Sequence, residues 1–162
     1  EMVTWSLAVE FCKELTKQER NMDQIPLGWT YHLPTEAQWE YACRAGTETS
    51  YSFGNKILPT DARWSDGKSP SQSSEVGRYP SNPWGFHDMH GNVWEWCSDW
   101  YGEYPSTVAI DPIGPTAGTK RVRRGGSWLN PAILLRSAWR FESAPSDVYS
   151  YVGFRACLSK RK

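Results

Sequence analysis

Cysteine and histidine are the residue types in this chain best suited to hold a transition metal or to act as a nucleophile. Four cysteines occur without any C-x-x-C pair, at Cys12, Cys43, Cys97 and Cys157. The three histidines are equally scattered, so the sequence does not predict a zinc site. Isolated cysteines in an uncharged setting are typically small buried hydrophobes. One or two disulfides are the alternative if the protein is extracellular.

The segment 120–155 combines rigid blocks with an irregular, aromatic-rich filling. The blocks are Arg124–Trp128, Leu135–Ala138 and Val152–Arg155. The intervals between them mix aromatic, small and acidic residues and lack the periods of about 2 or 3.6 that mark strands and helices. Tyr and Trp give large contact area at low entropic cost, so such a segment is typical of a binding surface. A long surface loop with stray aromatic residues is the alternative.

Length and charge narrow the class of protein. The 162 residues fit one domain, 1–162, and 18 basic residues balance 18 acidic ones. This balance gives no basic footprint for nucleic acid or an anionic membrane. No apolar run approaches the roughly 20 residues of a membrane-spanning helix, and we expect no signal peptide. The location of the protein therefore stays unassigned.

Apolar spacing and capping residues predict two helices. The first runs from about Thr4 to Lys17, and its expected buried stripe consists of Ala8, Phe11, Cys12 and Leu15. The second begins at a capping box, in which Thr35 and Gln38 bond to each other's backbone amides, and ends at Gly46. Short strands are expected at 31–33 and 93–96, and irregular loops at 47–83 and 102–118.

Four motifs, LPTEAQWEYACRAGT, DMHGNVWEWCSDWY, RRGGSW and VGFR, occur in this order along the chain. In them the chain resembles the formylglycine-generating-enzyme family, over about Trp5 to Cys157. The resemblance implies an α+β, C-type-lectin-like fold with two helices, small twisted antiparallel sheets and extensive loops. The helices and strands expected from the sequence pattern are compatible with that fold but do not select it.

The resemblance also bears on catalysis. Enzymes of the family oxidise a substrate cysteine with two copper-binding cysteines, and the matching positions here hold Asn130 and Leu135. Neither residue provides a thiolate, so we expect no oxidase activity, no catalytic residue and no copper. The family also pairs a helix cysteine, matched by Cys12, with one directly after GFR. Here Ala156 intervenes before Cys157, which turns the latter to the other face of a strand and leaves the pairing open.

A calcium site is a further implication of the resemblance. The family's calcium loop aligns with Asp88, Gly91, Val93 and Glu95. Two carboxylates and two backbone carbonyls would give the hard oxygen ligands that Ca²⁺ prefers. The alternative is that Gly91 and its neighbour form a simple turn and that Glu95 is a buried, paired acid.

Variable proteins of diversity-generating retroelements are similar to this chain in the same motifs, and they vary in a C-terminal stretch that ends near GFR. In these proteins, adenines of a template sequence are replaced at random. An Asn codon can therefore come to encode many different residues, while the codons of the rigid blocks persist. Most of the filling here fits that rule, whereas Trp139 and Glu142 cannot arise from an Asn codon. The resemblance predicts a non-catalytic ligand-binding protein with its binding segment at about 129–151. An enzyme of the same fold, or a structural accessory domain, is the alternative.

The predicted contact residues combine aromatic anchors with small and acidic residues. They are Leu129, Asn130, Trp139, Phe141, Glu142, Ser143, Ser146, Asp147, Val148, Tyr149 and Tyr151. Because a flat aromatic patch suits a large ligand, we expect a protein or cell-surface partner and no nucleic acid. The acidic residues favour a basic or hydroxyl-rich ligand. We expect a monomer, and the rival interpretation is that these aromatics pin the loop to the domain.

Five residues of the segment are expected to hold its rigid blocks in place, which we call the frame, rather than to contact a ligand. They are Arg124, Trp128, Arg136, Arg140 and Arg155. Arg136, Ala138 and Arg140 would share one face of a strand, opposite to Trp139 and Phe141. Loss of the Arg136 side chain is expected to destabilise the fold.

Overall fold

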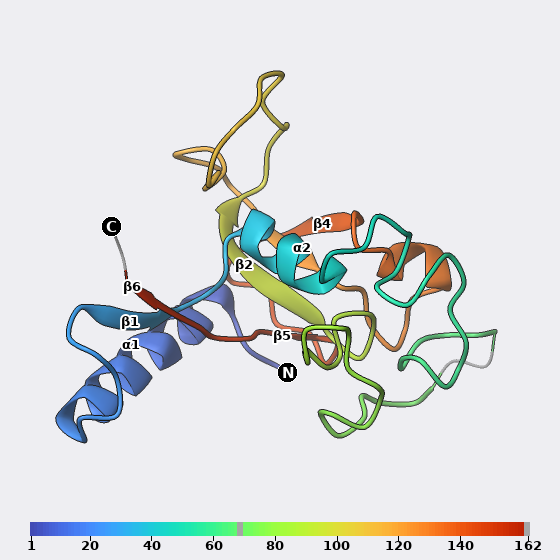
Figure 1. Ribbon diagram of the computed structural model, residues 1–162, viewed down its shortest axis with the longest axis horizontal. Coiled ribbons are helices and arrows are strands. Elements are labelled where there is room, and N and C mark those ends of the chain that lie inside the picture. The colour runs from blue at the N-terminus through green and yellow to red at the C-terminus, as the bar shows by residue number, and fades with distance from the viewer. Residues whose placement is uncertain (68–69, 161–162) are drawn as a thin grey trace.

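The computed structural model describes residues 1–67 and 70–160, which fold around two small sheets (Figure 1). The first sheet pairs β1 (Trp29–His32) with β6 (Cys157–Lys160). The second has the strand order β4-β3-β2-β5, built from β2 (Trp94–Trp100), β3 (Arg121–Arg124), β4 (Arg140–Ser143) and β5 (Val152–Gly153). Together with two α-helices and long loops, these sheets confirm the predicted α+β class.

One strand pair differs from the predicted antiparallel sheets. β1–β6, β2–β3 and β3–β4 are antiparallel, but β5 runs parallel to β2, with Val152 opposite Trp94. β4 and β5 lie at opposite edges of the sheet, so the chain between them must cross from one edge to the other. That crossing, 144–151, is the C-terminal part of the predicted binding segment.

Helix α1 (Trp5–Asn21) packs against β1, and its buried side differs from the predicted stripe. Ala8, Cys12 and Thr16 are the buried residues, and the Thr16 hydroxyl accepts a hydrogen bond of 2.8 Å from the Tyr31 amide. The prediction for Phe11 was wrong, because this residue is 53% exposed and packs only edgewise on a second ring. The helix lies on a narrow two-stranded ribbon. One line of side chains spaced four residues apart is therefore enough to fill the interface between them.

Helix α2 (Glu36–Arg44) begins at the predicted capping box. The Thr35 hydroxyl accepts from the Gln38 amide, and the Gln38 side chain accepts from the Thr35 amide. The buried side of the helix packs on one face of the four-stranded sheet. The resulting cluster consists of Trp39, Cys43, Met89, Cys97 and Val122.

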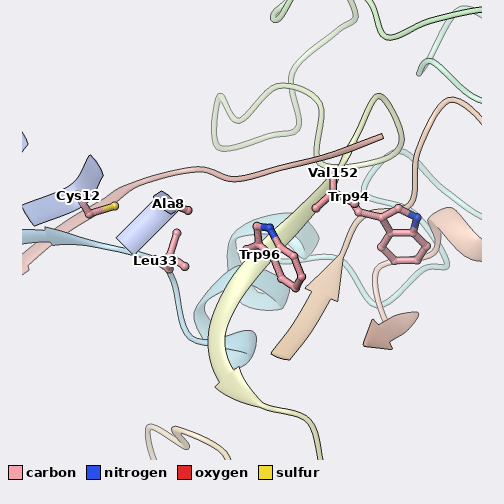
Figure 2. Packing of buried hydrophobic residues seen from close by; sticks show 6 residues of the cluster. All are labelled: Ala8, Cys12, Leu33, Trp94, Trp96 and Val152. Carbon is pink, nitrogen blue, oxygen red and sulfur yellow. The ribbon is translucent and has the colours of Figure 1, made fainter. Parts of the chain in front are cut away.

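A second cluster joins the two sheets on the other side of β2 (Figure 2). It consists of Ala8, Cys12, Leu33, Trp94, Trp96 and Val152. Trp96 is fully buried, and its indole N–H donates to the Val3 carbonyl at 3.0 Å. This cluster gives the second face of the sheet its apolar floor, on which the predicted binding segment lies.

The long loops are held by specific backbone contacts. Gly91 has a φ of +87°, and a Cβ there would lie 2.3 Å from the Arg63 carbonyl oxygen. The next residue, Asn92, bonds to Arg63 through its N–H and to Trp128 through its carbonyl. The loop between β2 and β3 extends away from the domain (Figure 1). In the described part of the chain, no helix has the length and apolar character needed to cross a membrane.

Candidate functional site: an aromatic surface on the second sheet

Side chains of the four-stranded sheet alternate between two faces. Val122 and Arg124 point toward α2, whereas Arg123 lies between Trp96 on β2 and Phe141 on β4. β4 follows the same alternation, because Arg140 reaches Glu36 of α2 while Phe141 packs on the opposite face. The second face therefore carries the aromatic residues of the predicted segment.

We call the residues gathered on this face the aromatic surface: Trp94, Arg123, Trp139, Phe141, Tyr149 and Tyr151. The Phe141 ring lies 5.6 Å from the Trp94 ring, and the Tyr149 and Tyr151 rings are stacked at 4.9 Å. The Arg123 guanidinium lies 5.3 Å from the centre of the Phe141 ring and 5.5 Å from that of Tyr149. Residues from β2, β3, β4 and the 144–151 crossing thus meet at one place.

The predicted contact residues differ in exposure. Phe141 is 46% and Val148 42% exposed, and Ser146 is also exposed. Trp139, Tyr149 and Tyr151 are half-buried because their inner sides pack against the Trp94–Trp96 cluster. Half-buried rings present one face to solvent and anchor the other, which suits contact residues with a fixed orientation.

The acidic members of the predicted set already have partners. The Asp147 carboxylate accepts from the Ala144 amide at 3.1 Å and from the Tyr149 hydroxyl at 3.3 Å. Glu142 pairs with Lys120 at 2.6 Å on the edge strand, and Ser143 is buried. Asp147 therefore shapes the crossing, and Glu142 is held at its margin.

Asn130 belongs to a turn, which the composition of the segment did not reveal. Its side-chain oxygen accepts from the Ser127 amide at 3.0 Å and the Ser127 hydroxyl at 2.7 Å, and its carbonyl accepts from Ser65. The exposed Leu129 lies beside it. The structure thus gives Asn130 a role in holding two loops together.

Leu135 closes the short 3₁₀ helix η1 (Ala132–Leu135) and is fully buried with Tyr51 and Ala62. This element corrects the strand expected through 136–138, since the chain becomes extended strand only at Arg140. Arg136 follows the 3₁₀ helix and is half-buried. It donates to the Ile133 carbonyl, and its guanidinium lies 5.2 Å from the centre of the Trp139 ring. Of the two positions matched to catalytic cysteines, one is a turn residue and the other is core.

A cysteine–histidine pair does exist, at a place that sequence spacing did not reveal. Cys43 Sγ lies 3.6 Å from Nε2 of the buried His90, and burial raises the pKa of this thiol to about 12. Burial lowers the pKa of His90 to about 4, so its ring is neutral at pH 7. His90 Nδ1 faces the Leu135 carbonyl and Nε2 accepts from Ser52, which fixes the tautomer. A protonated thiol is a poor nucleophile, so this pair is structural.

Cys157 is a free thiol in the structure, so a Cys12–Cys157 disulfide is not formed. Cys157 lies opposite His32 in the β1–β6 ribbon, and burial raises its pKa. The extra residue Ala156 displaces Cys157 by one position from the place that the family motif gives to the paired cysteine. A one-residue shift along a strand reverses the direction of the side chain.

Asp88, Val93 and Glu95 of the calcium prediction line a cavity of about 450 Å³, but the two carboxylates are engaged and Gly91 does not line it. Both Glu95 oxygens accept from Arg155 at 2.6 Å, and Oε2 also accepts from the Trp39 indole at 2.6 Å. Asp88 accepts from the Gly77 amide at 2.7 Å. A guanidinium occupies the place of a cation beside Glu95, so this arrangement does not fit a calcium ion. Calcium binding by Asp88, Gly91, Val93 and Glu95 stays an untested prediction.

A larger cavity of about 720 Å³ lies between α2 and the 102–115 loop, on the opposite side of the sheet. Glu36 in its wall is already engaged, because it bonds to Arg140 at 2.6 Å and to the Tyr104 hydroxyl at 3.1 Å. This cavity was not predicted from the sequence, because its walls come from segments far apart in the chain.

Comparison with known proteins places this fold. The model of the sulfatase-modifying factor enzyme 1-like domain matches residues 1–160. The formylglycine-generating enzyme of Mus musculus is 34% identical over 170 residues, covering 94% of this chain and 42% of the enzyme. The serine/threonine-protein kinase pkn1 of Chlamydia caviae is 42% identical over 128 residues, covering 76% of this chain and 20% of that protein. The chain thus spans less than half the length of these curated relatives.

Solved structures show the same fold. Treponema denticola variable protein 1 superposes with a TM-score of 0.87 and 30% identity, over 99% of this chain and 70% of that one. PvdO from Pseudomonas aeruginosa gives a TM-score of 0.83 and 27% identity, over 99% of this chain and 61% of that one. These similarities confirm the C-type-lectin-like, formylglycine-generating-enzyme-like fold. The chain belongs to the sulfatase-modifying factor enzyme 1-like domain family.

Proposed function

We propose that this chain is a non-catalytic ligand-binding protein that displays a diversifiable aromatic surface on its second sheet, in the manner of a diversity-generating retroelement variable protein. The observation that carries the proposal is the arrangement of the 139–151 segment. Its aromatic side chains gather on one face of the sheet, over a floor of Trp94 and Trp96 that comes from outside the segment. A surface of this kind can change its outer residues while its support stays constant.

The positions of the family's catalytic cysteines support the same proposal. Asn130 is bonded within its turn, and Leu135 is fully buried. Neither offers a thiolate or an open coordination position, both of which the family's oxidation requires. The similarity to Treponema denticola variable protein 1 extends over nearly the whole chain and agrees with this interpretation.

The ligand that we propose is a protein or a cell-surface molecule. Phe141, Tyr149 and Tyr151 form an outward patch rather than a deep cavity, and the two cavities described above lie outside it. Large, rigid rings that contact a flat partner supply binding energy at low entropic cost.

We expect the aromatic surface to tolerate random substitution. A displayed library randomised at Phe141, Ser146, Val148, Tyr149 and Tyr151 should retain mostly folded members. In the purified protein, Phe141→Ala should reduce the free energy of unfolding by less than about 1 kcal/mol, because an exposed side chain loses little packing.

A matched control uses the same face of the sheet. Trp96 is fully buried beside Arg123, and Trp96→Ala should cost about 3–5 kcal/mol. Folding can be scored in the library by protease resistance, next to a control library randomised at Trp96, Val122, Leu135 and Val152. If the surface library contains as few folded members as the control library, these aromatic residues are needed to pack the loop against the domain, and the proposal fails.

A further inference from the structure

Arg123 lies at the centre of the aromatic surface and lacks the acceptors that its neighbours on β3 have among the described residues, where Arg121 donates to the Ser98 carbonyl and Arg124 to Glu40. The Arg123 side chain projects from the central strand β3, and the residue is only 3% exposed. Its Nε and Nη1 atoms have no hydrogen-bond partner in the described part of the chain. By contrast, Arg140 and Arg155 each bond to a carboxylate with two nitrogens.

The surroundings of Arg123 are rings rather than acids. The guanidinium lies 5.7 Å from the ring centres of both Trp94 and Trp96, in addition to its approach to Phe141 and Tyr149. Cation–π attraction offsets part of the cost of removing the charge from water, but it leaves the N–H donors unpaired. An arginine keeps its proton in proteins, so the charge remains.

The acids of the segment do not supply the missing partner. Asp147 is the acid near enough to influence Arg123 electrostatically, but Oδ2 of its carboxylate holds the Ala144 amide and the Tyr149 hydroxyl. Glu142 is bound to Lys120. The basic ligand expected from the sequence would therefore meet acids that are already engaged, above a buried positive charge.

We infer that the aromatic surface accepts a ligand that carries a carboxylate, and that Arg123 binds this carboxylate through its unpaired N–H groups. The inference rests on the proposed function and names the chemistry of its ligand. A planar guanidinium binds a carboxylate with two parallel hydrogen bonds, and such charge-assisted bonds are strong where water is excluded. The aromatic rings around Arg123 suit a carboxylate that is attached to an apolar or aromatic group.

Three small probes of matched shape test the charge preference: phenylacetate, its neutral analogue phenylacetamide, and the cation benzylamine. Each is titrated at constant ionic strength while the Arg123 side-chain Nε–H resonance is followed by NMR. Phenylacetate should bind at least about tenfold more tightly than either other probe, as expected for hydrogen bonds to a charged group. Tightest binding by benzylamine would support the basic ligand and overturn the inference.

Variants assign the preference to Arg123. Arg123→Gln should lower phenylacetate affinity to the level of phenylacetamide, whereas Arg123→Lys should keep part of the preference. Asp147→Asn preserves an acceptor for the Ala144 amide and removes a negative charge that repels the carboxylate of the probe. Phenylacetate should therefore bind more tightly, and the affinity for phenylacetamide should be unchanged. If Arg123→Gln does not fold, the wild-type comparison of phenylacetate with phenylacetamide decides alone.

Equal binding of phenylacetate and phenylacetamide, including no binding of either, would overturn the inference. A preference for phenylacetate that survives Arg123→Gln would also overturn it. The proposed function fails separately, since its library experiment scores folding and involves no charged probe. If the library tolerates substitution but the probes bind with equal affinity, the inferred carboxylate ligand is rejected and the proposed binding surface is retained.

Discussion

Replacing Glu95 by Gln is expected to destabilise the protein by about 3 kcal/mol, toward the lower end of the range for breaking a buried ion pair. Glu95 is 5% exposed, and the change leaves the Arg155 guanidinium without its counter-charge beneath the 85–88 loop. The lower end of the range is appropriate because the Arg155 side chain remains 24% exposed. Chemical denaturation of wild type and variant measures the difference.

The same experiment tests the calcium prediction. The Glu95–Arg155 pair needs no metal, so the destabilisation should be equal in calcium and in chelator. The wild-type melting temperature should likewise be the same in both. A bound ion stabilises the folded state by mass action. A wild-type protein that melts higher in calcium, with the shift lost in Glu95→Gln, would show that the carboxylate holds the ion and not Arg155.

Arg124→Met is expected to cost about 3–5 kcal/mol, whereas Arg136→Met should cost only about 1 kcal/mol. The Arg124 side chain is fully buried and pairs with Glu40; it also lies 3.6 Å from Glu36, and its Nη1 donates to the Trp139 carbonyl. It therefore connects α2 to the start of β4. Arg136 is half-buried, with one hydrogen bond to the Ile133 carbonyl and a cation–π approach of 5.2 Å to the Trp139 ring.

This pair of variants is a matched comparison, because both lose an arginine of the 120–155 segment and gain the same side chain. Thermal and denaturant unfolding supply the two free energies. Equal losses would mean that the half-buried Arg136 holds the fold as strongly as Arg124 does, as the sequence predicted for a frame residue. A negligible loss at Arg124 would remove the link between α2 and the aromatic surface.

Local signals in the sequence were sufficient for the helices. Thr35 and Gln38 specify a cap within four residues, and the structure contains both predicted bonds. The resemblance to the family supplied the fold, which local patterns alone did not select. The Phe11 prediction failed because spacing shows that a residue can face a core but does not show how wide that core is.

Contacts between distant segments were the least predictable part of the site. The pairing of Glu95 with Arg155 joins residues 60 positions apart, and no local pattern distinguishes it from a metal ligand. The floor of the aromatic surface comes from β2, outside the segment that the sequence identified. The alternation of Arg140 and Phe141 was predictable because it depends only on the two-residue period of a strand.

The most direct test of the central claim is to sequence the gene, its flanking DNA and further copies of it. Our account predicts a neighbouring reverse-transcriptase gene and an imperfect repeat of the gene's 3′ end. Differences between copies should fall at template adenines, in the codons of exposed or half-buried residues such as Phe141, Val148 and Tyr149. The codons of Arg124, Trp128 and Gly153 should remain constant. A gene without such a repeat, in which differences between copies scatter over the whole chain, would contradict the account.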